Sequence, residues 1–334
     1  MKKNWLFIVS QLVIFALGVS SCNNNTPTEH QDGDIEIVRY ENIIFQSTPQ
    51  QLPSKLAEIR PLVECELIPM QLNNPDFIAA ITDFSQDPAM KEIYDSVAAH
   101  YQNLSWLEHG ITQAIEKLKK AFGKSEDLSF DYERFVTLTT GQFDYSNRIA
   151  VYEGSMLIAI DQYVLPCFEK FQYFGQPMYI VNMSDSSFLL RDCVSAIAEQ
   201  VVPFDEQKTR LLDFIVASGK TLYLLDIACP NMDERIKMRY TPEQMKWMKD
   251  NEGNVWGAFI QNKLLFEQDP SKFNNIIDDA PFTNAFRNDS APRTSEYIGL
   301  QMVRKYIAKT GKSLQEVMAA TSDEILKDSG YRPK

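Results

Sequence analysis

The sequence predicts a mainly helical α+β fold, built as a single domain around a small antiparallel or mixed sheet. The chain has 334 residues, of which 44% are hydrophobic and 11% aromatic, so it is long and apolar enough to bury a large core. Apolar residues recur at helical spacing in both the N-terminal and the C-terminal parts. Between them, residues 132–139 alternate in the two-residue period of a strand.

The N-terminal part of this domain is predicted to be one strand followed by helices. Ile35, Ile37 and Tyr40 alternate with polar residues and lead to the apolar run 43–45, which indicates an opening strand. A helix is expected after Pro53, and the pattern stays helical over 76–120. Its clearest stretch has apolar residues at spacings of four, three and four, closed by a glycine: Ile111, Ile115, Leu118, Phe122 and Gly123.

The centre and the C-terminal part complete the fold. Strands are predicted at 132–139, 148–152 and 156–160, with Gly141 and Gly154 in turns or bulges. Helices are predicted over 187–202, 206–225, 242–249, 254–266, 295–309 and 313–320. The polar run 250–254 has oxygen ligands but lacks the spacing of a calcium loop, so we interpret it as a turn between two helices.

The first 34 residues are not part of the predicted fold. Lys2 and Lys3 precede a short apolar run, which is typical of a secretory signal peptide over 1–21. Small residues then precede Cys22, a pattern like a bacterial lipobox, in which the chain is cut before the cysteine and its sulfur carries a diacyl lipid. The alternative is an uncleaved anchor in which Cys22 is an ordinary residue. Residues 22–34 are polar and aperiodic, so we expect a lipidated flexible tether before a domain at 35–334.

Charge and histidine content exclude several functions. Lys and Arg number 33 against 45 Asp and Glu, a net charge of −12 that argues against a nucleic-acid partner. The three histidines are His30, His100 and His109, so the C-terminal two-thirds cannot supply a His for a catalytic triad or an H-E-x-x-H zinc helix. No cofactor is expected from these counts.

The remaining cysteines and one glycine-lysine motif are given structural interpretations. Four cysteines follow Cys22 at wide spacing, and we favour free buried thiols, with a pair between Cys193 and Cys229 as the alternative: Cys65, Cys167, Cys193 and Cys229. Gly219-Lys220-Thr221 resembles the end of a phosphate-binding loop, but Phe214 stands where that motif needs a glycine. Apolar residues at helical spacing flank it, so nucleotide binding is rejected.

The predicted helix over 187–202 contains one peptidase-like residue. An H-E-x-x-H helix places two histidines four residues apart around zinc, and the glutamate between them activates water. Here Ala198 and Val202 occupy the two ligand positions around Glu199. Alanine and valine cannot bind a metal, and from this motif alone Glu199 is an ordinary charged residue on an amphipathic helix.

Four segments in order along the chain raise the significance of this motif. They are 148–166, 189–203, 218–223 and 295–307. With the lipobox at Cys22, they resemble the GldB-like gliding-motility-associated lipoproteins of Bacteroidota over residues 35–334. The resemblance implies a fold like that of a zinc peptidase, or zincin, with the 198–202 segment as its metal helix and the vicinity of Ser218 as the source of an acidic ligand.

Departures from that pattern suggest a degenerate peptidase-like domain without catalysis. Glu199 alone cannot position a water, because Ala198, Val202 and Ser218 supply no metal ligand. The expected protein is therefore a lipid-anchored envelope component, facing the periplasm, that works through contacts with other envelope proteins.

Two rival functions remain open. One is an envelope hydrolase that uses Glu199 with a displaced carboxylate, the candidates being Asp161, Asp213 and Asp226. The other is a periplasmic chaperone or solute-binding module that retains a peptide groove.

Overall fold

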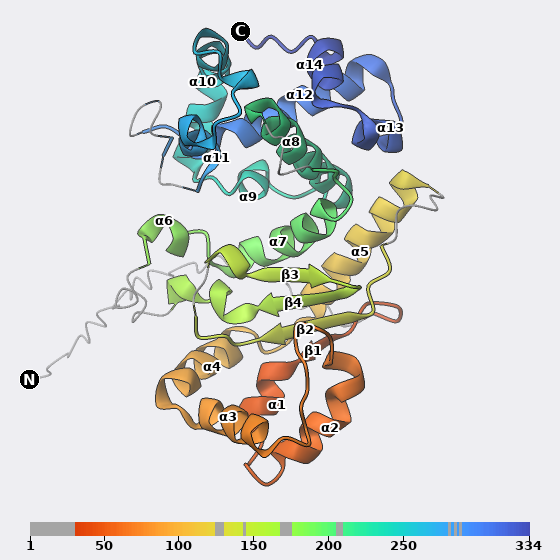
Figure 1. Cartoon of the computed structure of the whole chain (residues 1–334), viewed down its shortest axis with the longest axis vertical. Coiled ribbons are helices and arrows are strands. Elements are labelled where there is room, and N and C mark those ends of the chain that lie inside the picture. The colour runs from red at the N-terminus through yellow and green to blue at the C-terminus, as the bar shows by residue number, and fades with distance from the viewer. Residues whose placement is uncertain are drawn as a thin grey trace, which may run out of the picture.

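Four short strands form a mixed sheet in the described part of the chain, as the computed structural model shows in Figure 1. The structure describes residues 31–123, 130–142, 145–167, 176–204, 210–279, 282–283, 286 and 289–334. The strands are β1 (Ile37–Arg39), β2 (Arg134–Leu138), β3 (Ile149–Tyr152) and β4 (Ser155–Ala159), and their order is β1-β2-β4-β3. β2 runs parallel to β1 and β4, whereas β3 and β4 form an antiparallel hairpin.

The alternation along β2 and β4 separates two hydrophobic cores. Successive side chains of a strand point to opposite faces of the sheet. Phe135 and Met156, which are paired across the strands, belong to the larger core, whereas their neighbours Val136 and Leu157 belong to a smaller one. This is why both alternate sets of the predicted central strand are apolar or buried.

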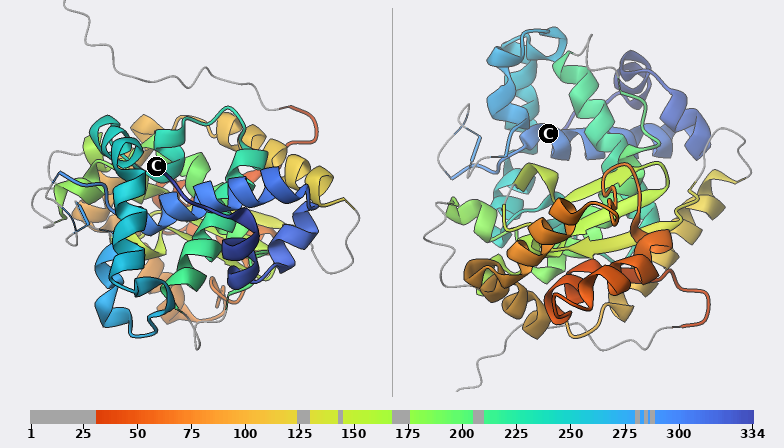
Figure 2. Two further views of the ribbon diagram at one scale, coloured as in Figure 1. Left: turned by 90° about the horizontal axis from the view of Figure 1, so that it is seen from above. Right: turned by 60° about the horizontal axis from the view of Figure 1, so that its bottom comes forward.

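The N-terminal helices lie mainly on the face with the smaller core. The elements in this part are α1 (Tyr40–Gln46), α2 (Leu52–Val63), α3 (Pro75–Gln86), α4 (Pro88–His100) and α5 (Ser105–Phe122). The right view of Figure 2 shows the first of them in front of the sheet. α5 instead buries its predicted apolar side in the larger core, together with residues of α7 (Ser186–Glu199) and α8 (Leu211–Ala228).

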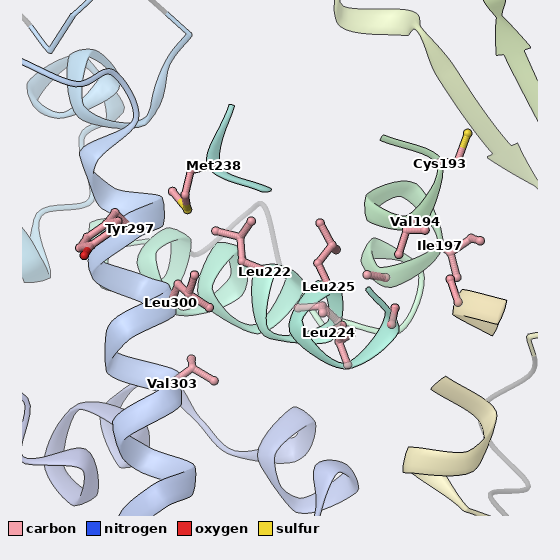
Figure 3. Close-up of a cluster of buried hydrophobic side chains, with 14 of the residues drawn as sticks. Cys193, Val194, Ile197, Leu222, Leu224, Leu225, Met238, Tyr297, Leu300 and Val303 are labelled. Carbon is pink, nitrogen blue, oxygen red and sulfur yellow. The ribbon is translucent and has the colours of Figure 1, made fainter. Parts of the chain in front are cut away.

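The C-terminal helices stack beyond the opposite face of the sheet. In addition to α7 and α8 they are α6 (Met178–Val181), α9 (Glu234–Met238), α10 (Pro242–Gln261), α11 (Asn274–Ile277), α12 (Thr294–Thr310), α13 (Leu314–Ala319) and α14 (Ser322–Ser329). Leu222, Leu225, Leu300 and Val303 are among the side chains that fill the space between these helices (Figure 3).

α8 and α12 cross with their backbones in contact. Gly219 of α8 lies against Gly299 of α12: a Cβ atom added at Gly299 would be 1.9 Å from the Ile215 carbonyl oxygen, and one added at Gly219 would be 2.4 Å from that of Gly299. Only glycine permits this approach at either position. The crossing fixes the helices that form the side of the molecule away from the sheet.

The fold confirms the predicted class, but several local predictions were wrong. The opening strand ends at Arg39, because Tyr40, Glu41 and Ile44 are buried at the spacing of the helix α1. The polar run 250–254 is not a turn but the middle of the continuous helix α10. There Glu252 accepts a hydrogen bond of 2.6 Å from the Tyr331 hydroxyl, and such tertiary contacts outweigh the weak helix propensity of the run.

Among the described residues, no helix is both long and apolar enough to cross a membrane. The relation to zinc peptidases stays a prediction.

Candidate functional site

A cleft of about 840 Å³ opens beside α7, between the sheet and the C-terminal helices. It continues into a second compartment of about 500 Å³ between α7 and α8, because both are lined by Arg191, Ser195, Glu199, Arg239 and Asp279. The two compartments differ in character. The first is lined by tyrosines and charged groups, and the second adds an apolar wall that includes Phe204, Phe214 and Leu222.

One side of α7 forms the wall shared by the two compartments. Arg191, Ser195 and Glu199 follow one another at intervals of four residues, so they lie on the same side of the helix. The Ser195 hydroxyl donates to Glu199 at 3.1 Å. Val194 and Ile197 point away from this side into the large core. The apolar pattern thus fixes the orientation of α7, and its polar side is left to the cleft.

Three guanidinium groups surround one buried carboxylate, that of Asp192. Arg239 bonds both of its carboxylate oxygens, Arg191 donates to Oδ1 at 3.2 Å, and an Arg148 nitrogen lies 4.0 Å from Oδ2. The Tyr163 hydroxyl donates to Oδ2 at 2.7 Å. We call Arg148, Arg191 and Arg239 the arginine wall. Three positive charges meet one negative charge on this wall, and the carboxylates of Glu199, Asp278 and Asp279 line other parts of the same compartment.

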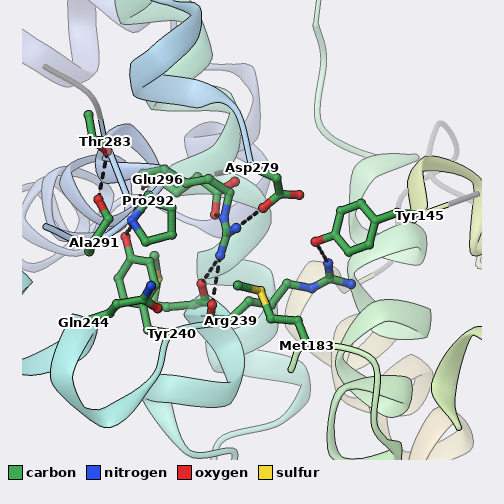
Figure 4. Close-up of polar contacts among 12 residues, drawn as sticks. Tyr145, Met183, Arg239, Tyr240, Gln244, Asp279, Thr283, Ala291, Pro292 and Glu296 are labelled. Atoms are coloured by element: carbon green, nitrogen blue, oxygen red, sulfur yellow. Dashed lines mark hydrogen bonds and ion pairs between the residues drawn. The ribbon is translucent and has the colours of Figure 1, made fainter. Parts of the chain in front are cut away.

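Aromatic and backbone groups fix the orientation of the arginine wall. Arg239 donates to the Tyr145 hydroxyl at 2.6 Å, and Figure 4 shows its side chain extended toward that ring. The Arg148 guanidinium lies 4.0 Å from the centre of the same ring, a cation–π contact. Arg148 also donates to the Met183 carbonyl at 2.9 Å and to the Ser184 hydroxyl at 2.6 Å, whereas its Nε has no partner in the described structure.

A fourth arginine connects the cleft to the start of α12. Arg293 pairs with Asp279 and lies 3.4 Å from Glu296, and it donates to the Met238 carbonyl at 2.8 Å. Both Arg239 and Arg293 have a left-handed backbone, with φ of 53° and 44°. That conformation is strained for a residue other than glycine, and such strain persists only where surrounding contacts impose it.

The arginine wall determines the charge state of Asp192. Burial by itself would raise the pKa of this carboxyl, but Arg239, Arg191 and Arg148 more than offset that effect and hold the pKa below its usual value. Burial lowers the pKa of Arg148, and the adjacent Arg239 charge lowers it further. A guanidinium stays protonated in proteins, so the wall remains charged at neutral pH.

Ala198, Glu199 and Val202 do not form a metal-helix constellation in this structure. Ala198 is fully buried in the large core and lines neither compartment of the cleft. The helix ends at Glu199, three residues before Val202 and not at Val202 as predicted, because Pro203 disfavours helical conformation in the residue before it. Glu199 does line the cleft. The four-residue spacing that faces the cleft therefore belongs to Arg191, Ser195 and Glu199.

The three candidate carboxylates of the rival hydrolase do not join Glu199. Asp161 is buried beside the sheet and bonds the backbone of Thr140 and Gly141, whereas Asp213 pairs with Arg210. Asp226 pairs with Arg304. None of the three lines either compartment of the cleft. In the described part of the chain, no group of three His, Cys, Asp or Glu side chains is arranged to hold a metal ion.

Lys220 of the phosphate-loop-like motif lies in the interior of α8. Its ammonium group donates to the carbonyl oxygens of Met318 and Ala320, each at 2.8 Å, at the end of α13. Burial lowers the pKa of this lysine to about 8. The motif thus joins α8 to α13 and leaves no free loop for a nucleotide.

The cysteines fit the favoured prediction only in part. Cys65, Cys193 and Cys229 are free, so the alternative pairing of Cys193 with Cys229 is wrong, but only Cys193 is fully buried. The proposed lipidation site, Cys22, lies outside the described residues, as does the side chain of Cys167.

Sequence reasoning missed the arginine wall. A signal was present in the adjacent Arg191 and Asp192, which interrupt the apolar helix pattern with two opposite charges. Nothing in the local sequence of Arg148 or Arg239 shows that they meet Asp192, because they are 44 and 47 residues away from it and follow unrelated patterns. The left-handed backbone of Arg239 and the burial of Arg148 are seen only in the three-dimensional structure.

The fold and cleft define a mainly helical α+β protein whose principal cleft is lined by paired arginines and carboxylates. The comparison with family models then assigns it. The model of the gliding motility protein GldB matches residues 21–333, so the chain belongs to this family of gliding-motility-associated lipoproteins. No curated protein and no solved structure matches the chain significantly.

Proposed function

We propose that this chain is a non-catalytic, lipid-anchored component of the cell envelope that supports gliding motility through contacts with other envelope proteins. Family membership supports the gliding-motility association and lipid anchoring. The arginine wall supports the absence of catalysis, and it is the observation on which the proposal depends.

The argument from the arginine wall is electrostatic. A catalytic zinc site needs three protein ligands that donate electron pairs, and it works best where negative charge surrounds the cation. Here the side of α7 that faces the cleft presents Arg191 and Ser195, and two further guanidiniums lie against Asp192. The three guanidiniums repel a divalent cation placed against the arginine wall, although carboxylates such as Glu199 and Asp279 line other parts of the cleft.

Glu199 provides the sharpest test. Its carboxylate bonds the Ser195 hydroxyl and lies at the C-terminal end of α7, where the helix dipole disfavours negative charge. If it has no catalytic role, Glu199→Gln will retain the hydrogen bond and change the free energy of unfolding by less than about 1 kcal/mol. We expect cells that carry Glu199→Gln to keep wild-type function in a complementation assay, with protein abundance checked by immunoblot.

Metal content provides the second arm of this test. The full-length lipidated chain, purified in non-ionic detergent, is expected to hold no stoichiometric zinc and to show no chelator-sensitive proteolysis. One zinc per chain, together with a hydrolysis that Glu199→Gln abolishes, would establish the rival hydrolase and contradict the proposal.

A further inference from the structure

The arginine wall has more positive charge than its own carboxylate neutralises. Three guanidiniums contact Asp192, and Arg191 Nη2 has no hydrogen-bond partner among the described residues. Arg191 itself lines both compartments of the cleft. A guanidinium edge with a free donor is suited to an oxyanion, because charge-assisted hydrogen bonds to carboxylates are among the strongest in proteins.

The surroundings hold this wall ready before anything binds. Arg148 is 4% exposed and bonded to Met183 and Ser184, and Arg239 is fixed between Asp192 and Tyr145. An arginine that is already ordered loses little conformational entropy when an anion binds.

The rest of the cleft indicates a polypeptide as the carrier of that oxyanion. The compartment that adjoins the wall has an apolar side with Phe204, Phe214 and Leu222, which a small hydrophilic anion would leave without a contact. Glu199 lies at the other end of the α7 side, roughly 10 Å from Asp192 along the helix axis. An extended chain covers that distance in about three residues. A cleft of about 840 Å³ that continues into another compartment accommodates such a segment.

We propose that the cleft binds a polypeptide segment whose acidic side chain pairs with the arginine wall and whose neighbouring apolar side chain enters the compartment between α7 and α8. This inference rests on the proposed function, because it gives the chemistry of the protein contacts that the proposed function requires.

The probe is a fluorescein-labelled hexapeptide, acetylated and amidated at its ends, with two glutamates beside a leucine. Its counterpart has glutamine in place of both glutamates. Binding to the full-length lipidated chain in non-ionic detergent is followed by fluorescence anisotropy at low and high salt. We expect the acidic peptide to bind at least about tenfold more tightly than the glutamine peptide, and its affinity to fall as salt rises.

Variants locate the binding site. Arg191→Gln removes the open donor from a partly exposed position, and we expect the affinity for the acidic peptide to fall about tenfold or more. Arg60→Gln removes an exposed arginine of α2, far from the cleft lining, and serves as the matched control with unchanged affinity. Arg148→Gln is the second variant. Circular dichroism and Tm show which variants are folded. If Arg148→Gln is unfolded, the affinity of Arg191→Gln alone tests the inference.

Each other outcome overturns the inference. Equal binding of the two peptides, no binding of either, or full affinity in folded Arg191→Gln would each show that the wall does not recognise an acidic segment. Inorganic phosphate is titrated as a third probe. One outcome is that phosphate binds in an Arg191-dependent manner while the acidic peptide does not bind. In that case the site binds a small free oxyanion, and the proposal of a polypeptide ligand is wrong.

The same experiment separates failure here from failure of the proposed function. Cleavage of the peptide, followed by mass spectrometry, would contradict the non-catalytic proposal even if the wall binds acidic segments. Absence of binding, with Glu199→Gln still functional and zinc absent, would leave the proposed function in place and remove only this inference.

Discussion

Two buried carboxyl groups, those of Asp192 and Asp161, have surroundings that shift their pKa in opposite directions. Asp192 is surrounded by guanidiniums, which hold its pKa low. Asp161 is completely buried, and its Oδ2 accepts hydrogen bonds from the Thr140 and Gly141 backbone at 3.1 and 2.9 Å. Burial raises the pKa of Asp161 to about 6 despite these bonds, and its Oδ1 has no partner in the described structure. Asp192 therefore stays ionised below neutral pH, whereas Asp161 is ionised at neutral pH only at a cost in folded-state stability.

Asp161 predicts a specific pH dependence. Its pKa is higher in the folded chain than the ordinary value of 3.8, so the folded state binds the proton more tightly. The stability linked to this group is fully present below pH 3.8 and is lost as the pH rises through about 6. The full difference corresponds to roughly 3 kcal/mol.

The test compares wild type with Asp161→Asn, which keeps an oxygen for the two backbone donors. Denaturant unfolding at pH 7 and at pH 4.5 gives the free energy of unfolding of each protein. We expect the free energy of unfolding of the wild type to rise relative to that of Asp161→Asn when the pH is lowered from 7 to 4.5. A difference that is the same at both pH values would mean that Asp161 does not titrate in this range.

Among the elements, the pair α8 and α12 depends most on individual backbone atoms. Gly219 and Gly299 are 80 residues apart in the chain, yet their backbones touch. Close-packed interiors tolerate one extra methyl group poorly where the neighbour is backbone, because a carbonyl cannot rotate away as a side chain can.

Gly299→Ala should therefore destabilise the protein despite alanine's higher helix propensity. We expect a loss of about 1–3 kcal/mol in the free energy of unfolding, with more if α12 has to move. Gly257→Ala in α10 is the matched control, because a Cβ there meets nothing within 4 Å and alanine favours the helix by up to about 1 kcal/mol. Denaturant melts of both variants check this; equal stability of Gly299→Ala and wild type would contradict the close crossing.

Elements with strong local patterns could be predicted from the sequence. The apolar positions of α5, such as Ile111 and Leu118, are buried as expected, and Gly123 ends the helix with a positive φ. The alternation of β2 is found between Arg134 and Leu138. The turn predicted at 250–254 was wrong because of tertiary contacts. This polar run within α10 is helical where the C-terminal segment packs against it.

The candidate site was less predictable than the elements. Glu199 was found because it resembles one position of a known motif, and it does face the cleft. The arginine wall could not be derived, because its charge depends on Arg148, Arg191 and Arg239 meeting at one carboxylate from three separate segments. Sequence spacing describes one helix or strand at a time, whereas this site is formed by the packing between them.

At the scale of the whole molecule, the N-terminal strand and the cleft lie in different parts of the fold. Figure 1 places β1 beside the N-terminal helices, and α7 with its cleft lies toward the C-terminal helices. A lipid at Cys22 would attach the chain through the segment that leads into β1.

Replacing the proposed lipid attachment residue tests this arrangement. Cys22→Ser removes the sulfur that carries the acyl chains, and we expect the protein to leave the membrane fraction in detergent-free extracts, since two acyl chains provide most of the membrane affinity. Cys65→Ser, which changes a free thiol within the domain, should remain in the membrane and is the control. Retention of Cys22→Ser at the wild-type level would contradict lipid anchoring.

The short strand β1 also covers one edge of β2. Its residues Ile37, Val38 and Arg39 pair in parallel with Phe135, Val136 and Thr137 of β2. A chain shortened past Arg39 would leave that edge of β2 without partners, and an exposed apolar strand edge is a template on which another copy can add. A truncated form made for solution work must therefore keep β1, or it will tend to aggregate even though its helices are intact.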